Sequence, residues 1–239
     1  MTTEQQEHRA EQHGHQHRDV SGGWLRPAVF GAMDGLVTNV SLIAGVGGGG
    51  GSQHTIVLTG LAGLAAGAFS MAAGEYVSVS SQNELIRAEV DKERHELENN
   101  AEAEQAELAG MLRARGVSPA TARKAAAEIS EHPEKALAVH SMEELGVNPS
   151  ELPSPQAAAG ASLLCFAVGA IIPLLPYLGG LHLLWLALAL AGVAAVAGGG
   201  LVARLAGRPF WRGAIRQLGL GAGAATVTYL IGLAAGHVA

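Results

Sequence analysis

Five apolar segments, each close to the length of a membrane-spanning helix, constrain this chain more than any other feature of its sequence. They are residues 27–46, 54–79, 157–178, 181–203 and 214–236. A helix needs about 20 apolar residues to cross the hydrocarbon of a bilayer. With 49% hydrophobic and only 15% charged residues, the chain is too apolar for an ordinary soluble domain. We therefore predict an all-α membrane protein with five transmembrane helices.

Lysine and arginine fall on only one side of the predicted membrane. Three precede the first segment, eight lie between the second and third, and four lie between the fourth and fifth. The connections on the other side, GVGGGGGSQH, YLGGLH and GHVA, contain none. The positive-inside rule then places the N-terminus and the charged loops in the cytoplasm. Since neither a signal peptide nor an organelle-targeting segment is evident, we expect the cytoplasmic membrane of a bacterial cell.

One polar insertion, residues 81–156, interrupts the apolar segments and holds 15 of the 21 acidic residues. The stretch from Asn83 to Arg115 lacks proline and predicts one long helix that continues the second apolar segment. Ser118 with Pro119, and Pro133 further on, mark the starts of two shorter helices. The predicted domains are a tail (1–24), transmembrane helices 1 and 2 (25–80), a cytoplasmic three-helix metal-binding domain (81–156) and transmembrane helices 3 to 5 (157–239).

Carboxylates gather along one face of the long predicted helix. At 100° per residue, a narrow stripe collects five carboxylates and a thioether. The stripe consists of Glu89, Glu93, Glu96, Glu104, Glu107 and Met111. It is either a solvated acidic face or a site for multivalent cations, which would relieve the repulsion between like charges. The segment HSMEELG favours cation binding, because His140 and Glu144, one turn apart, are donors suited to a transition metal.

Two acidic residues lie inside predicted spans, where a carboxylate is costly and usually marks an ion or proton pathway. Asp34 shares a helix face with Thr38 and Ser41. Glu75 follows Met71 by one turn, and oxygen donors beside a thioether suit Fe²⁺ or Mn²⁺ better than Mg²⁺ or Ca²⁺. We predict that these five residues line a transport path, with Asp34 the partner of Met71 and Glu75.

Small residues precede Met71 at steps of four along the second span. Gly63 and Gly67 occupy these positions. Small residues at this spacing let a neighbouring helix approach closely. We therefore expect this face to pack against protein rather than lipid.

These motifs closely resemble the vacuolar iron transporter family and its bacterial members. The resemblance covers nearly the whole chain from Leu25 and rests on DGLVTNVSLIAGV, AGAFSMAAGEYVSVSSQ and IIPLLPYL, together with the acidic insertion. It implies a five-span homodimer that exchanges a divalent metal for protons along the dimer interface. It also implies that Asp34 and Met71 match the intramembrane metal-binding residues of the family. The residues that match the carboxylates of its cytoplasmic metal-binding domain are Glu93, Glu96, Glu104, Glu107 and Glu144.

The chain departs from the plant-type pattern at two positions. Gly63 stands where the plant-type transporter has a glutamate, and Glu75 is the candidate to supply that charge. His140 stands where that type has methionine, and imidazole binds Fe²⁺, Mn²⁺, Co²⁺ and Zn²⁺ alike. The N-terminal tail adds histidines that either collect metal or are incidental. These are His8, His13, His15 and His17.

The predicted function is a proton-coupled antiporter that exports Fe²⁺, and next Mn²⁺, from the cytoplasm. We expect a homodimer in the lipid bilayer, with no prosthetic group, no catalytic residue and no nucleic-acid partner. Three other functions are open: a membrane-bound di-iron oxidase of ferritin type, a metal sensor that moves no metal, and a channel. The oxidase would need Glu-x-x-His on its bundle helices, and the sequence contains no such motif.

Overall fold

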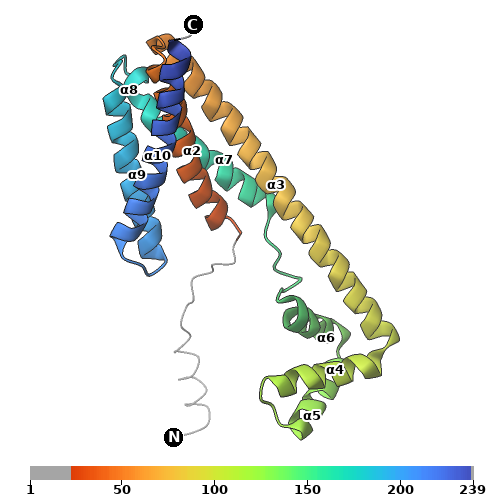
Figure 1. The fold of residues 1–239 in the computed structure, drawn as a ribbon. Helices are drawn as coiled ribbons and strands as arrows, with labels where there is room; N and C mark the ends of the chain where they lie inside the picture. Colours follow the sequence, from red (N-terminus) through yellow and green to blue (C-terminus); the bar gives the residue numbers. More distant parts are fainter. Residues whose placement is uncertain (1–22, 238–239) are drawn as a thin grey trace, which may run out of the picture.

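The computed structural model describes residues 23–237, and within that range the chain forms helices and the turns between them, without a β-strand (Figure 1). In chain order the elements are α2 (Leu25–Gly48), α3 (Gln53–Asn99), α4 (Ala101–Ala114), α5 (Pro119–Ser130), α6 (Pro133–His140), the π-helical turn η1 (Ser141–Leu145), α7 (Pro155–Ile171), the 3₁₀ turn η2 (Ile172–Leu174), α8 (Leu175–Leu178), α9 (Leu184–Leu205) and α10 (Phe210–Gly236).

Five helical stretches of the described chain are long and apolar enough to cross a membrane. They are α2, α3, the stretch Pro155–Leu178 that combines α7, η2 and α8, and then α9 and α10. The prediction of an all-α protein is therefore confirmed, with five helices long and apolar enough to cross a membrane. Figure 1 shows these helices gathered into one bundle, from which α3 extends to a second group of helices formed by α4, α5 and α6.

The third spanning stretch is not a regular helix. It changes from α-helix to a 3₁₀ turn at Ile172 and ends in the short helix α8. Pro173 and Pro176 explain the change, because proline lacks a backbone donor and clashes with the preceding turn. The chain then reverses at Gly180, whose φ of 82° is a left-handed conformation that glycine adopts without strain.

Helix α7 packs against both α2 and α3. Its Phe166 is 1% exposed and lies against two glycines, one on each neighbour. A Cβ atom at Gly35 would overlap the backbone of Phe166, and one at Gly67 would overlap its ring. At Gly63 a Cβ would meet Leu42 of α2. The prediction that the Gly63–Gly67 face meets protein is thus confirmed, and its neighbours belong to the same chain.

The second group of helices corrects the prediction of one long helix from Asn83 to Arg115. Helix α3 does continue beyond the apolar segment, but it ends at Asn99, and α4 begins at Ala101 in a new direction (Figure 1). The amide of Asn99 donates to the carbonyl oxygen of His95 at 2.7 Å. Asparagine competes in this way with regular helical bonding, so the Asn99–Asn100 pair ends the helix. The insertion was predicted to contain three helices. In the structure it contains the end of α3 and then the three helices α4, α5 and α6.

The two shorter helices begin where the sequence predicts. The Ser118 hydroxyl accepts a hydrogen bond from the backbone N–H of Thr121, and Pro119 is the first residue of α5. Pro133 is likewise the first residue of α6. The chain returns to the bundle through a linker in which the carbonyl oxygen of Pro153 accepts a hydrogen bond from the Asn83 amide at 2.9 Å. This bond fixes the linker to α3 where the bundle and the insertion meet.

Candidate metal centre

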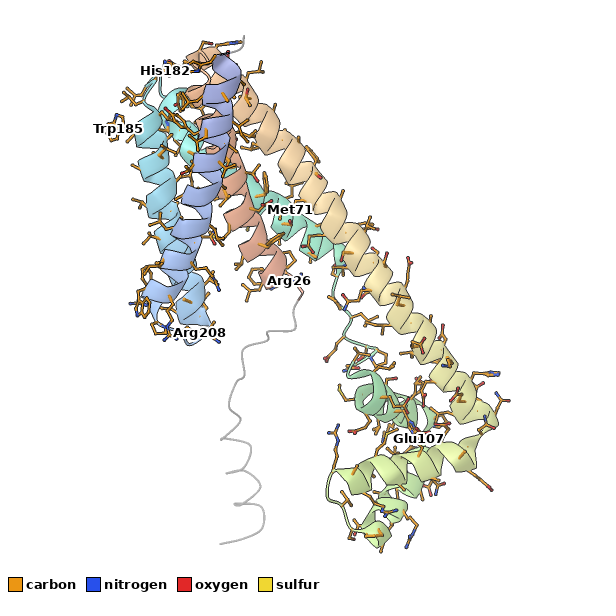
Figure 2. The ribbon with its side chains drawn as sticks, viewed as in Figure 1. Arg26, Met71, Glu107, His182, Trp185 and Arg208 are labelled. Atoms are coloured by element: carbon orange, nitrogen blue, oxygen red, sulfur yellow. The ribbon has the colours of Figure 1, made fainter. Side chains whose placement is uncertain are left out.

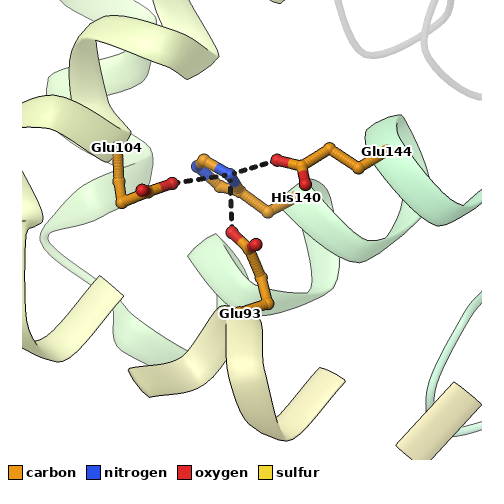
Figure 3. Close-up of side chains that lie close together, drawn as sticks. All are labelled: Glu93, Glu104, His140 and Glu144. Atoms are coloured by element: carbon orange, nitrogen blue, oxygen red, sulfur yellow. Dashed lines mark hydrogen bonds and ion pairs between the residues drawn. The ribbon is translucent and has the colours of Figure 1, made fainter. Parts of the chain in front are cut away.

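Four side chains from three parts of the insertion converge on one point (Figure 3). Around His140 Nδ1 lie Glu93 Oε1 at 3.0 Å, Glu144 Oε1 at 3.2 Å and Glu104 Oε2 at 3.7 Å. We call Glu93, Glu104, His140 and Glu144 the four-residue cluster. His140 is fully buried, Glu93 and Glu104 are buried, and Glu144 is exposed. Three carboxylates of one sign are thus held together around a single imidazole.

The spacing of these donors fits a shared transition-metal ion. Such an ion lies about 2.0–2.2 Å from each nitrogen or oxygen ligand, so two of its ligands lie about 3–4 Å apart. The three distances to His140 Nδ1 fall in this range, and all four donor atoms lie within 4.8 Å of one another. Glu93 Oε1 is buried and outside hydrogen-bond geometry despite its short distance to Nδ1. A buried carboxylate oxygen without a hydrogen bond is costly unless a cation occupies the site.

The local helix geometry places each donor. Glu93 comes from the end of α3, and Glu104 comes from the first turn of α4 after the break at Asn100. His140 is the last residue of α6, and Glu144 lies in the π-helical turn η1 that follows. Single π-helical turns within helices frequently occur at functional sites. The break at Asn100 therefore turns a stripe on one helix into two carboxylates that face each other.

Packing and one ion pair hold these elements in place. Leu108 and Ala109 of α4 are buried against Ala126 of α5. Arg115, which follows α4, pairs with Glu143 of η1 at 2.9 Å. The cluster is thus built on the ends of helices that share a hydrophobic core.

Burial and mutual repulsion act on the two buried carboxyls. The pKa of Glu93 is raised first by burial and then by the nearby charge of Glu144, while His140 opposes the shift. The pKa of Glu104 is raised by burial and by Glu107, and His140 again opposes the shift. A dication bound here would favour the ionised forms of both groups, so metal and protons would compete for the cluster.

The structure separates the other predicted metal residues of the insertion from the four-residue cluster. Glu96 is half-buried and Glu107 is exposed, and both act on the cluster through their charge. Glu89 is exposed and pairs with Lys92 at 3.8 Å. Met111, the thioether of the predicted stripe, is half-buried. Two neighbours of Glu144 in η1 also lie outside the cluster: Met142 is exposed, and Glu143 pairs with Arg115.

The predicted intramembrane residues lie on α2 and α3. Asp34, on α2, and Glu75, on α3, form no ion pair with any residue between 23 and 237, and Met71 packs against the Phe166 cluster of α7. Figure 2 shows Met71 on α3 beside the bundle. Thr38 is half-buried, and the buried Ser41 hydroxyl has no hydrogen-bond partner in the described chain. No ion pair within the described chain tests the predicted pairing of Asp34 with Met71 and Glu75, which stays a prediction.

Asn39, a polar residue within the first apolar segment, has a definite role in packing. Its side chain is fully buried, and the amide donates to the carbonyl oxygen of Ala170 on α7 at 2.5 Å. The second polar atom, Oδ1, faces Gly63 and has no hydrogen-bond partner among the described residues. In the sequence, Asn39 is recognisable as an amide side chain that directly follows Thr38 among apolar residues. The predicted histidine sites at His8, His13, His15 and His17 lie outside the described residues.

Comparison with known proteins identifies the family. Residues 25–233 match the model of the VIT family. A protein named vacuolar iron transporter from Acanthamoeba castellanii is 41% identical over 164 residues, covering 68% of this chain and 59% of that protein. Vacuolar iron transporter homolog 1 of Oryza sativa is 37% identical over 211 residues, covering 86% of this chain and 71% of that protein. The resemblance inferred from the sequence motifs is confirmed, and the protein belongs to the VIT family.

Proposed function

We propose that this protein carries a divalent transition metal across the membrane in exchange for protons, with Fe²⁺ the preferred substrate and Mn²⁺ the next. Two related proteins carry the name vacuolar iron transporter or a homolog of it, and the chain has five helices able to span a membrane. The observation that carries the proposal is the convergence of His140 with three glutamates at transition-metal spacing. Imidazole and carboxylate together suit Fe²⁺, Mn²⁺, Co²⁺ and Zn²⁺.

The four-residue cluster would collect metal before transport. It lies in the insertion at the end of α3 that is remote from the bundle (Figure 1). Figure 2 places Arg26 and Arg208 at one end of the bundle, which the positive-inside rule assigns to the cytoplasm. With this orientation the insertion is cytoplasmic and the transport direction is export.

The path through the bundle would be completed by a second copy of the chain. Asp34, Met71 and Glu75 lie on helices whose faces are only partly covered by their own subunit. Thr38 and Ser41 share the face of Asp34 and offer further oxygen donors. Carboxylates in the membrane interior need partners, and a homodimer would bring the residues of α2 and α3 from two subunits to one path.

Proton coupling would follow from competition at these carboxylates. An arriving dication favours the ionised form and releases protons, and protonation from the opposite side weakens the site and releases the metal. Met71 would add affinity for softer metals without taking part in the protonation.

Transport by the purified protein in liposomes tests the proposal. Vesicles containing a pH-sensitive dye and a metal-sensitive dye report both fluxes together, and we expect Fe²⁺ and proton movements in opposite directions. Glu75→Gln should keep some metal binding but uncouple the metal flux from pH. Binding without flux would indicate a sensor, and flux independent of a pH gradient would indicate a channel. Iron-dependent oxygen consumption by the same protein would indicate an oxidase.

A further inference from the structure

A crevice between α2, α9 and α10 opens at the basic end of the bundle. It has a volume of about 440 Å³ and is lined by Arg26 of α2 and by Arg216 and Gln217 of α10. Apolar side chains, among them Phe30 and Val202, form the rest of the wall. Two guanidinium groups thus stand beside an apolar surface at one site.

A second, apolar crevice of about 470 Å³ lies further along the same three helices. On α2 the lining passes from Met33 to Leu36, and on α10 it passes from Gln217 to Leu218. The far end reaches Trp185, which Figure 2 shows at the opposite end of the bundle from Arg26. A crevice with a charged lining and an apolar crevice thus follow each other along the same helices.

The ends of the three helices that form the charged crevice are rich in arginine. Residues 23–33 and 200–237 contain five arginines and no aspartate or glutamate. Arg204 and Arg212 lie over the rings of Phe210 and Trp211, each at 5.3 Å. Arg26 and Arg216 form no ion pair with another described residue. The charged crevice therefore suits an anion.

We propose that the two crevices bind one anionic phospholipid, with its phosphate at Arg26, Arg216 and Gln217 and an acyl chain in the apolar crevice. Basic pockets between transmembrane helices bind anionic headgroups in this way. Exposed Trp24 and Trp211 fit the headgroup level, where tryptophan is enriched. A second copy of this chain is a poorer occupant, because the same face would bring arginines against arginines without a carboxylate between them.

Lipid binding to the purified full-length protein tests the headgroup site. Phosphatidylglycerol and phosphatidylcholine with the same acyl chains are titrated in detergent, and bound lipid is counted by native mass spectrometry. We expect the wild type to prefer phosphatidylglycerol. Arg26→Gln with Arg216→Gln should weaken this binding by about thirtyfold, since each surface cation contributes about fivefold. Arg208→Gln with Arg212→Gln changes the charge equally outside the crevice and should have little effect.

A second variant tests the acyl-chain site. A Cβ at Gly221 would lie 3.7 Å from Val37, an ordinary contact, so Gly221→Leu should fill the apolar crevice without a backbone clash. It should weaken binding of long-chain phosphatidylglycerol, whereas free glycerol phosphate should not displace the lipid from the wild type. The proposal is overturned if phosphatidylcholine binds equally well, if both arginine pairs lose binding equally, or if Gly221→Leu changes the oligomeric state and leaves lipid binding intact.

Discussion

The insertion and the bundle handle their carboxylates in opposite ways. In the insertion, one chain brings three glutamates and a histidine within 4.8 Å of one another. In the bundle, Asp34 and Glu75 form no ion pair with a described residue of their own chain. A site complete in one subunit can hold a metal ion before any other event. Carboxylates without an ion pair in their own subunit need another partner in the membrane interior.

This difference follows from how each region is packed. The insertion uses a helix break, a π-helical turn and a small hydrophobic core to direct polar side chains inward. The bundle instead uses glycine and Phe166 to bring helices into close contact, which leaves little room for polar groups between α2 and α3. We therefore expect substitutions in the bundle to affect transport itself, and those in the insertion to affect affinity.

Asp34→Asn should have the largest effect, because it removes the only carboxylate of α2. We expect loss of metal flux in proteoliposomes, while calorimetric titration still detects metal at the four-residue cluster. The two side chains have nearly the same shape, so the thermal unfolding temperature should change little. Flux at the wild-type rate would show that the path does not pass Asp34 and would remove the contrast between the two regions.

Gly67→Leu should damage the bundle through packing alone. Any side chain at this position overlaps the ring of Phe166, and overpacking a close contact costs about 1–3 kcal/mol. Gly74 lies on the same helix with open space around it, so Gly74→Leu is the matched control. Thermal unfolding in detergent should show a lower transition temperature for Gly67→Leu only. Equal behaviour of the two variants would mean that α7 does not pack at Gly67.

The sequence was sufficient to predict the five spanning helices, because long apolar segments and one-sided arginines are strong local signals. It also supplied all members of the four-residue cluster, since the carboxylate stripe and HSMEELG each contained some of them. The helical wheel nevertheless assumed one straight helix and treated Glu104 and Glu107 as equivalent. In the structure Glu104 is buried and Glu107 is exposed. Only the new direction taken after Asn100 separates them, and periodicity contains no information about that turn.

The bundle was harder to predict because its contacts join residues far apart in the sequence. The bond between Asn39 and Ala170 spans 131 positions. The position of Phe166 between Gly35 and Gly67 likewise depends on which helices become neighbours. Hydropathy identifies such helices but does not order them, so the pairing of Asp34 with Met71 rests on residue chemistry and on the family resemblance and stays a prediction.

His140→Ala should weaken metal binding at the cluster without stopping transport at saturating metal. The substitution removes the nitrogen that all three carboxylates approach. Removing a group that only supports a metal ligand already lowers metal affinity by about ten- to a hundredfold. We therefore expect the metal affinity of His140→Ala to fall by at least this factor. Titration with Co²⁺, whose absorption reports nitrogen coordination, measures the change. His132→Ala, at an exposed position before α6, is the control. Unchanged Co²⁺ binding by His140→Ala would remove the imidazole from the site.

Glu104→Gln should give the smallest but most specific effect. Burial and the charge of Glu107 raise the pKa of Glu104 in the folded protein above its unfolded value. The folded state therefore binds the proton more tightly, and stability falls as pH rises through the raised pKa. Without metal, Glu104→Gln should accordingly unfold at a temperature about 2–4 °C higher than the wild type at neutral pH. This difference in unfolding temperature should be smaller at a pH below the pKa of Glu104 in the unfolded chain. With metal the order should reverse, because the variant has lost a ligand and gains less stability from the ion.

Glu102→Gln removes an exposed charge from the same helical turn and should show neither change. If Glu104→Gln destabilised the metal-free protein and kept the full stabilisation by metal, Glu104 would be a structural group, and the insertion would no longer differ from the bundle in holding a complete site.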